Sequence, residues 1–286
     1  MHWVVVGASG FLGQALTTTV TQQGDTVQGL SLRDPATADL SVLDEADVVV
    51  NLAGASIGRV PWTSSYRQLL RNSRIVSTRA IAERIASRAR PPVFVLQTAT
   101  GVYGADRGDT VLDEDSEPGD GFLAELVVDW EAAAMPAIES GCRVVRLRTG
   151  VVLDRDGGAF GPMLLPFRFG LGGRLGSGRQ YMCVVGLFDW IAAVRFVVAN
   201  QDCSGPYNVV LPTPPTNQQF TEALGRALRR PTLLPVPAWA IRTVLGGLAV
   251  ELLGSRRAVP RRLREAGFEF GAPTVDAMLT DALHQV

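Results

Sequence analysis

The sequence lacks lysine entirely, and all 27 residues in its Lys and Arg total are arginine. Arginine keeps its proton at physiological pH, so it can bind an anion but is a poor general base. Histidine is also scarce: His2 and His284 lie at opposite ends of the 286-residue chain. A Ser-His-Asp or Cys-His mechanism therefore lacks its base.

The cysteines do not indicate disulfides or a metal site either. Cys142, Cys183 and Cys203 are odd in number and scattered along the chain. Such an arrangement suits neither a set of disulfides nor a zinc site. We therefore expect no metal centre.

A large excess of charge and a long hydrophobic run are missing as well. The net charge is −1 and 47% of the residues are hydrophobic, values that indicate a soluble globular protein that does not bind nucleic acid. The longest apolar stretch, Pro237–Gly254, contains Arg242 and Glu251, which is typical of a core or interface helix and not of a membrane span. A first strand from residue 2 leaves no room for a signal peptide. We expect a cytoplasmic protein with no membrane partner.

The most informative motif of the sequence lies in its first 13 residues. Val4–Val6 is a short β-branched run, typical of a parallel strand buried on both faces. Gly7, Gly10 and Gly13 follow, and Gln14–Gly24 can continue as a helix closed by its glycine. The spacing is Gly-x-x-Gly-x-x-Gly, which differs from the Gly-x-Gly-x-x-Gly of the dinucleotide fingerprint. A glycine-rich turn without a ligand therefore stays an alternative to dinucleotide binding.

The chemistry of a strand that turns tightly into a helix favours an anion. Unpaired N–H groups at the helix N-terminus can hold a pyrophosphate. In this interpretation Gly7 permits the turn, Gly10 lets the backbone approach the phosphates, and Gly13 lets the helix pack closely on the sheet.

The loop after the second expected strand, Thr26–Leu30, bears on the choice of coenzyme. Arg33 can meet the 2′-phosphate of NADP. Asp34 is the competing candidate for the 2′-hydroxyl of NAD, and Arg33 can also be a solvated loop residue. We expect NADP, with NAD possible.

Strands and helices alternate through the first half of the chain, which predicts an α/β fold with a doubly wound parallel sheet. We expect this Rossmann core over residues 1–155, with 187–211 returning to it. Further strands are expected at residues 47–54, 93–96, 142–147 and 207–210, and helices at 66–90 and 122–140, where Pro136 can bend or end the second. Residues 156–186 and 212–286 show no sheet pattern of their own and form a smaller C-terminal substrate-binding lobe. Helices are expected in the second half at 163–169, 188–200, 216–230 and 237–254.

Several motifs together resemble the extended short-chain dehydrogenases/reductases, and more narrowly the atypical branch called epimerase family proteins. They occur in one order over nearly the whole chain: Gly7–Gly13, Asn51–Ile57, Thr98–Gly104, Phe122–Leu126, Asp129–Ala133, Arg148–Leu153, Leu164–Phe167, Gly170–Gly178, Pro235–Ala238 and Gly267–Phe268. The resemblance implies an NAD(P)-binding Rossmann core with a substrate lobe, and leaves the reaction open.

The coenzyme is expected at the glycine turn, after the second strand and at the carboxyl ends of the later strands. The candidate cofactor-binding residues are Gly7, Ser9, Gly10, Phe11, Leu12, Gly13, Arg33, Asp39, Leu40, Leu52, Ala53, Gly54, Thr98 and Val151.

The catalytic pair of the resembling family is missing. Ordinary members use Tyr-x-x-x-Lys, in which tyrosine exchanges a proton with the substrate oxygen. Here Leu123 and Val127 stand at the matching positions. Thr98 matches the serine that binds the substrate carbonyl, with Thr100 as a near alternative. Tyr103 is the phenol of this neighbourhood, either a proton donor or a packed side chain.

Two charged residues complete the candidate catalytic set. Glu125 can act as acid or base if burial raises its pKa, and is otherwise a surface carboxylate. Arg74 stands where typical members of the family have asparagine. It can bind a substrate carboxylate or phosphate, or form a structural ion pair.

These residues lead to three hypotheses. The first is an NADP-dependent oxidoreductase or epimerase-like enzyme that acts on a carbonyl or secondary alcohol of a small molecule. The second is an NADP(H)-binding sensor or scaffold without turnover. The third is a lyase or isomerase on the same fold that uses Glu125. We expect a monomer or a homodimer.

Overall fold

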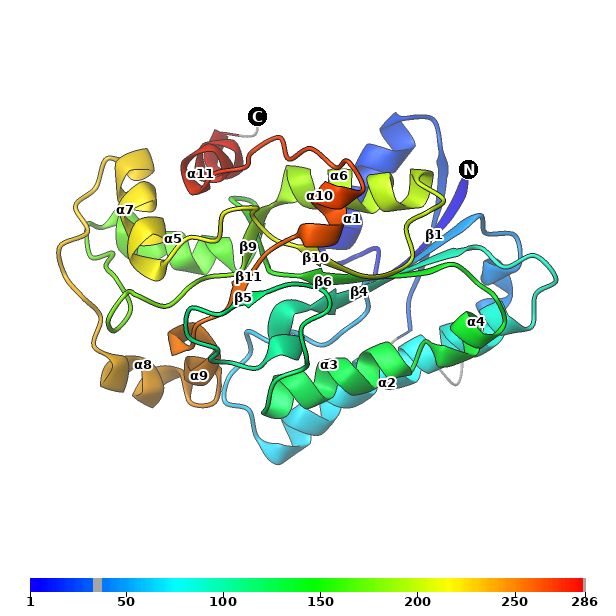
Figure 1. Cartoon of the computed structure of the whole chain (residues 1–286), viewed down its shortest axis with the longest axis horizontal. Coiled ribbons are helices and arrows are strands. Elements are labelled where there is room, and N and C mark those ends of the chain that lie inside the picture. The colour runs from blue at the N-terminus through cyan, green and yellow to red at the C-terminus, as the bar shows by residue number, and fades with distance from the viewer. Residues whose placement is uncertain (33–37, 285–286) are drawn as a thin grey trace.

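The computed structural model describes residues 1–32 and 38–284. A six-stranded sheet with the strand order β10-β6-β4-β3-β1-β2 runs through its centre, and every neighbouring pair is parallel (Figure 1). This sheet confirms the predicted α/β class. Its strands are β1 (His2–Val6), β2 (Thr26–Leu30), β3 (Val48–Asn51), β4 (Val93–Ala99), β6 (Val144–Thr149) and β10 (Gly205–Val209).

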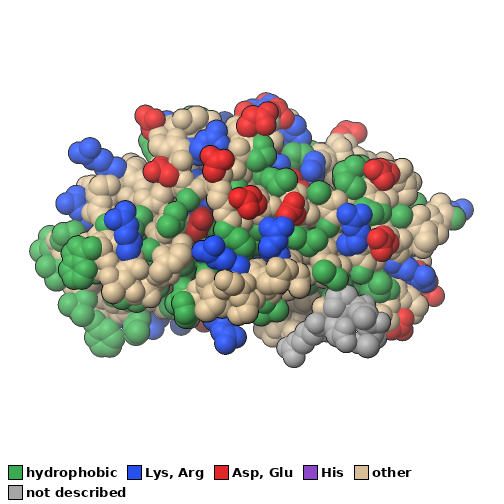
Figure 2. Space-filling model, turned by 90° about the horizontal axis from the view of Figure 1, so that it is seen from below, with side chains coloured by type: hydrophobic (Ala, Val, Ile, Leu, Met, Phe, Trp, Pro, Cys, Tyr) green, Lys and Arg blue, Asp and Glu red, His purple; other side chains and the backbone are tan. Residues whose placement is uncertain are grey.

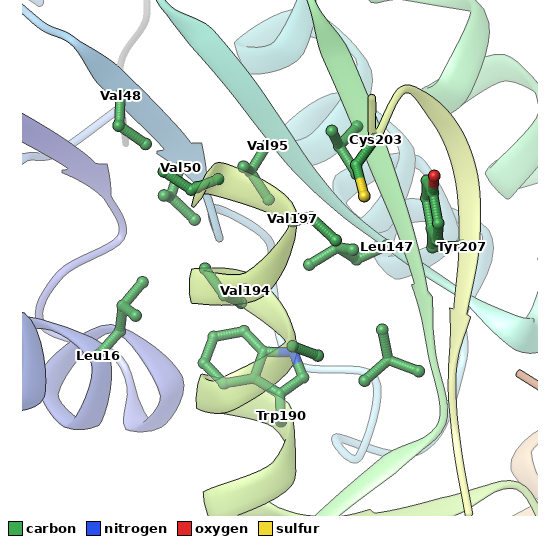
Figure 3. Close-up of a cluster of buried hydrophobic side chains, with 14 of the residues drawn as sticks. Leu16, Val48, Val50, Val95, Leu147, Trp190, Val194, Val197, Cys203 and Tyr207 are labelled. Atoms are coloured by element: carbon green, nitrogen blue, oxygen red, sulfur yellow. The ribbon is translucent and has the colours of Figure 1, made fainter. Parts of the chain in front are cut away.

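Helices cover both faces of this sheet. One face carries α1 (Phe11–Gln22) and α6 (Leu187–Ala199), and the other carries α2 (Ser64–Ala86), α3 (Phe122–Ala132) and α4 (Met135–Glu139). Figure 3 shows part of the first face, where Leu16 of α1 and Trp190 of α6 lie against the central strands.

The valine run of β1 explains why two layers of helices are needed. Trp3 and Val5 belong to the core under α1 and α6, whereas Val4 and Val6 belong to the core under α2 and α3. Successive side chains of a strand point to opposite faces, so both faces of β1 must be apolar. Each fully buried valine contributes about 1.5–3 kcal/mol of transfer free energy.

The second half of the chain adds short elements at the other end of the molecule (Figure 1). Contrary to expectation, this part has short strands in sheets: β8-β7-β9, and β11, which pairs with β5 from the first half of the chain. Their strands are two to four residues long, too short to give a periodic pattern in the sequence. The bounds are β5 (Val111–Leu112), β7 (Val151–Asp154), β8 (Gly157–Gly158), β9 (Val184–Gly186) and β11 (Arg257–Ala258). The helices here are α5 (Phe160–Arg168), α7 (Asn217–Leu228), α8 (Ala238–Leu245), α9 (Leu248–Leu253), α10 (Arg261–Glu265) and α11 (Val275–His284).

Two expected long helices are each divided in two. The 122–140 segment forms α3 and α4, because Pro136 in the first turn of α4 cannot continue the hydrogen-bond ladder of α3. The 237–254 segment forms α8 and α9, because Gly246 takes a positive φ of 52° and ends α8. Among the described residues, no helix has both the length and the apolar composition needed to cross a bilayer.

Candidate functional site

The carboxyl ends of four neighbouring strands meet at one edge of the sheet. The chain leaves β1 through α1 to reach β2 on one side, while β3 pairs with the other side of β1. The sheet order therefore reverses between β1 and β3, and in folds of this kind the ligand crevice is expected at such a switch point. A Cβ placed on Gly7 would lie 3.2 Å from the backbone of Leu52, so the two strand ends are in close contact.

The turn from β1 into α1 requires glycine at two positions. Gly7 has a φ of 82°, a conformation that other residues rarely adopt. A Cβ on Gly13 would lie 2.3 Å from the carbonyl oxygen of Gly7 and 2.7 Å from Cα of Ala8. The first turn of α1 is therefore pressed against the loop, as the sequence predicts for Gly13.

The start of α1 is open. Gly10 is the N-cap, and no side chain caps the helix among the described residues. The first helical hydrogen bond runs from Gln14 N to Gly10 O at 2.9 Å, so the N–H groups before it have no partner within the helix. A Cβ on Gly10 would meet only Gly7 O, at 3.3 Å, and both Ser9 and Gly10 are exposed. These residues fit a pyrophosphate, which accepts hydrogen bonds from such N–H groups.

The residues after β3 form one wall of the crevice. Asn51 is buried; its side chain donates to Thr78 Oγ1 at 2.9 Å and accepts from Ala53 N at 3.1 Å. This fixes the backbone of Leu52 and Ala53 beside the glycine turn. Gly54 is exposed.

Arg74 of α2 lies directly behind this wall. A Cβ on Gly54 would lie 2.8 Å from Cζ of Arg74. The guanidinium is only 7% exposed; it donates to the carbonyls of Leu70 (3.2 Å) and Ala55 (2.9 Å) and lies 5.2 Å from the ring centre of Trp130. Burial lowers the pKa of Arg74 to about 10.

The predicted structural ion pair of Arg74 is not found in the described part of the chain, and its Nε has no hydrogen-bond partner there. A buried cation without a carboxylate is suited to an anionic ligand.

The remaining cofactor candidates lie around the crevice. Asp39 accepts a hydrogen bond from Ser41 N at 2.9 Å and thereby caps the short helix η1 (Leu40–Leu43). The side chain and the backbone N–H of Ser41 lower the pKa of the Asp39 carboxyl group. Phe11 packs on the turn between β7 and β8, where a Cβ on Gly157 would lie 2.1 Å from its ring. Leu12 packs against the core under α1, and Val151 is exposed. Arg33 and Asp34 lie outside the described residues, so the choice between NADP and NAD that rested on them stays a prediction.

Thr98 is turned toward α3. Its hydroxyl donates to Oε1 of Glu131 at 3.1 Å. Glu131 also accepts two hydrogen bonds from Arg148, at 2.9 and 3.0 Å, and one from Arg146 at 3.2 Å. The role proposed for Thr98 therefore competes with a buried ion-pair network that the sequence analysis missed. Its signal was present: two arginines alternate within the otherwise apolar strand β6, which places both on one face.

Tyr103 belongs to the same network. It lies in the short helix η2 (Thr100–Tyr103) and is fully buried. Its hydroxyl donates to Oδ1 of Asn208 at 2.8 Å and accepts from Arg148 Nη1 at 3.3 Å. Burial raises its pKa to about 12, despite the nearby Arg148. This geometry matches the packed-tyrosine interpretation better than that of a proton donor.

The resemblance placed the Tyr/Lys pair at Leu123 and Val127, and both side chains are apolar. Leu123 and Val127 are both buried, and Val127 packs in a cluster with Cys183. Thr100 is buried as well, and the nearby Cys183 thiol donates to Arg256 O at 3.3 Å; burial raises the pKa of this thiol. Glu125, in contrast, lies exposed on α3. The burial on which its acid–base role depends is absent, and the lyase or isomerase hypothesis loses its physical basis.

Comparison with protein families agrees with this geometry. A model described as NAD dependent epimerase/dehydratase family matches residues 3–152. The chain belongs to this family. A second model, described as a domain of unknown function (DUF1731), matches residues 236–282.

The relatives span the whole chain. An epimerase family protein of Mycobacterium bovis is 42% identical over 288 residues, covering 96% of this chain and 95% of that protein. Epimerase family protein SDR39U1 of Mus musculus is 37% identical over 294 residues, covering 99% of this chain and 100% of that protein. The resemblance to the epimerase branch of the short-chain dehydrogenases/reductases is confirmed.

Solved structures extend the comparison. Human epimerase family protein SDR39U1 (isoform 2), crystallised with NADPH, superposes with a TM-score of 0.92 at 33% identity and full coverage of both chains. A dTDP-4-dehydrorhamnose reductase from Bacillus anthracis, in complex with NADP, has a TM-score of 0.75 at 14% identity, covering 99% of this chain and 98% of that one. The second similarity shows the shared fold alone.

Proposed function

We propose that the chain is an NADP-dependent oxidoreductase or epimerase-like enzyme that acts on a carbonyl or secondary alcohol of a small molecule. The observation that carries the proposal is the uncapped start of α1 at the β1/β3 switch point, beside the exposed Gly10. The NADPH complex of the human relative supports the same choice of coenzyme.

The chain's own residues divide the work of holding the coenzyme. The N–H groups after Gly10 would bind the pyrophosphate, and the backbone of Leu52–Gly54 would lie along the coenzyme. Arg74, behind Gly54, supplies the positive charge on this side of the crevice. When bound, the nicotinamide supplies a hydride or accepts one at its C4 atom.

No strong acid or base is proposed beside the reacting oxygen of the substrate, so the nearby residues can act only by orienting this oxygen. Leu123 and Val127 exclude water from one side. The hydroxyl of Thr98 donates its proton to Glu131, so Thr98 belongs to the buried network and does not itself donate to a substrate oxygen. Thr100 is the second hydroxyl at this edge. In this proposal these residues position the substrate and a water molecule delivers the proton, which allows slow turnover.

A second candidate function rests on a specific observation. The hydroxyls of Tyr103 and Thr98 are engaged in the Glu131–Arg148 network, and apolar side chains fill the place of the Tyr/Lys pair. A protein that binds NADP(H) and reports its state without turnover would have this arrangement.

Calorimetric titration with NADPH and NADH tests the binding site. We expect NADPH to bind with micromolar affinity, on the order of −8 kcal/mol. Gly10→Asp puts a negative charge where the phosphates would lie, and we expect it to weaken binding by about 3 kcal/mol, or about a hundredfold. Gly161→Asp is the matched control, because a Cβ there meets nothing within 4 Å. Equal affinity of both variants for NADPH, or no uptake of either coenzyme by the unmodified protein, would contradict the proposal.

Isotope transfer distinguishes the enzyme from the sensor. The protein is incubated with NADPH deuterated at C4 and a panel of aldehydes and ketones, and mass spectrometry detects deuterium in the alcohols. An enzyme transfers deuterium, and Thr100→Val slows the transfer while NADPH affinity stays constant. Tight NADPH binding without transfer to any carbonyl would favour the sensor.

A further inference from the structure

A group of large apolar side chains is exposed at the far end of the lobe. They are 59–85% exposed, and we name them the lobe-end patch: Phe169, Leu171, Leu233, Leu234, Trp239 and Val244. Figure 2 shows hydrophobic side chains gathered at the left end of the molecule, the end where Figure 1 places α8. Contiguous exposed apolar surface of this kind marks an interaction site.

The patch comes from three segments that are held together by backbone contacts. Leu175 forms an isolated bridge with Val236, and Val236 N donates to Arg174 O at 2.8 Å. A Cβ on Gly173 would overlap the carbonyl oxygen of Leu234, at 1.6 Å. Phe169 and Leu171 therefore lie on the same surface as the Leu233–Leu234 loop, which leads directly into α8.

The charge of the segments that form the patch is mostly positive, although Glu222 and Asp276 lie beside their arginines. Residues 157–188 and 223–250 contain no Asp or Glu, although the whole chain has 28 acidic residues and a net charge of −1. Their arginines are exposed: Arg168, Arg174, Arg179, Arg226, Arg229, Arg230 and Arg242. Arg226 pairs with Asp276 at 2.7 Å, and the other six form no ion pair within the described residues.

A hollow beside the patch concentrates this charge. It has a volume of about 410 Å³ and follows the carboxyl end of α7. Its lining is Arg226, Arg229 and Arg230 together with Glu222, Gly225, Pro231 and Thr232. Guanidinium groups bind phosphate oxygens in a planar, bidentate manner. The hollow can therefore bind a phosphate group, and its lining residues end directly before the exposed Leu233.

We propose that the lobe-end patch binds the surface of a bilayer that contains anionic phospholipids. Trp239, Phe169 and the leucines enter the boundary between headgroups and acyl chains, and the arginines contact the lipid phosphates. The hollow at α7 holds one headgroup. A two-fold contact between copies of this surface would instead bring several arginines of one copy against those of the other, with Glu222 as the carboxylate of the hollow, and this excess of positive charge disfavours self-association.

This surface is separate from the coenzyme crevice. Figure 1 places α8 at one end of the molecule, whereas α1 lies nearer its middle and β1 extends toward the other end. Membrane binding and NADPH binding can therefore be measured independently, and NADPH uptake serves as a control for correct folding of every variant.

Vesicle co-sedimentation of the full chain tests the proposal. We expect binding to vesicles of equimolar phosphatidylcholine and phosphatidylglycerol, weak binding to phosphatidylcholine alone, and release by high salt. The change Arg229→Gln/Arg230→Gln should weaken partitioning by about 25-fold, from about 1 kcal/mol per arginine. Leu233→Ser/Trp239→Ser removes two inserted side chains, and we expect it to lower partitioning at least about tenfold.

The matched controls come from α2, where Val76 and Arg79 are exposed far from the patch. Val76→Ser and Arg79→Gln should leave partitioning unchanged. Brominated lipids should quench the fluorescence of the unmodified protein, and Trp239→Phe should remove that quenching.

Several results would overturn the proposal. Absence of sedimentation with anionic vesicles would do so, as would equal binding to neutral vesicles. If titration with inorganic phosphate showed binding abolished by Arg229→Gln/Arg230→Gln while vesicles were not bound, the hollow would be a free phosphate site. Sedimentation velocity that showed self-association lost in Leu233→Ser/Trp239→Ser would assign the patch to a second copy.

Discussion

Two polar regions lie at the carboxyl edge of the same sheet, and they are built in opposite ways. At the β1–α1 turn, no side chain of the described residues caps the backbone donors at the start of the helix. Beneath β4 and β6, the carboxylate of Glu131 accepts from Thr98, Arg146 and Arg148, and Arg148 reaches on to Tyr103. The first region leaves its hydrogen-bonding capacity for a ligand, and the second uses it internally.

The difference separates residues that bind from residues that hold the fold. A buried network whose groups are already paired has little to offer a substrate, and removal of one member leaves the others without partners. The N–H groups at the N-terminus of α1 form no hydrogen bonds within the helix. Substitutions there should therefore affect ligand binding more than folding. The predictions below test this contrast, beginning with the largest expected effect.

Glu131→Gln should destabilise the protein most. The variant leaves the buried Arg148 without a counter-charge, and we expect the free energy of unfolding to fall by about 3–5 kcal/mol. Urea denaturation measures it. Asp129→Asn, on the same helix, breaks the exposed pair with Arg71 and should cost less than about 1 kcal/mol. Similar losses for both variants would show that the network contributes no more than a surface ion pair.

Two glycines of the turn should respond differently to alanine. Gly13→Ala forces a Cβ to 2.3 Å from Gly7 O, and we expect a loss of about 1–3 kcal/mol of stability. Gly10→Ala meets only Gly7 O at 3.3 Å and should leave stability nearly unchanged while it weakens NADPH binding. Thermal unfolding and calorimetry of both variants measure the two effects. A Gly10→Ala protein that binds NADPH normally would place the phosphates elsewhere.

Tyr103→Phe should have an intermediate effect. It leaves the Asn208 oxygen with one donor fewer, at a cost of about 1–3 kcal/mol. The pKa of Tyr103 is raised to about 12 in the folded protein, from 10.0. At a pH between these two pKa values, the phenol is ionised in the unfolded chain but still protonated in the folded protein, so the free energy of unfolding falls as pH rises. The advantage of the unmodified protein over Tyr103→Phe should shrink by about 1.4 kcal/mol per pH unit above pH 10. A constant difference across this range would show that the phenol is not buried.

Glu125→Gln should have the smallest effect. Its side chain is exposed on α3, so we expect a change of less than about 0.5 kcal/mol in stability and none in NADPH binding or turnover. Steady-state kinetics with any carbonyl that accepts deuterium provides the measurement. A large loss of turnover would restore Glu125 as a catalytic residue.

The regular half of the molecule was predictable, because buried parallel strands leave continuous apolar runs and glycine marks the turns between elements. The expected strands and helices around β1, α1, β3 and β4 match the structure within a few residues. The lobe was less predictable. Its strands are two to four residues long, and Gly246 divides a helix whose composition suggests continuity.

The candidate site shows the same limit. The glycine turn is local, so its shape follows from consecutive residues. Thr98 and Glu131 are 33 positions apart, and Tyr103 and Asn208 are 105 apart, so no spacing rule connects them. The lobe-end patch is also assembled from separate segments. The prediction of no membrane partner rested on the longest apolar stretch, which contains Arg242 and Glu251 and is not typical of a membrane span. Binding to a membrane surface depends instead on which side chains the tertiary contacts bring together.

The sequence by itself determined the opening strand and turn, the absence of the Tyr/Lys pair and the lack of any basic side chain able to replace it. Only the tertiary structure decided which polar groups are free. It paired Thr98 and Tyr103 within the buried network, placed Glu125 in solvent and left Arg74 without a carboxylate among the described residues. The physical reason is that a side chain's chemistry depends on its burial and its partners, and these come from segments distant in the sequence.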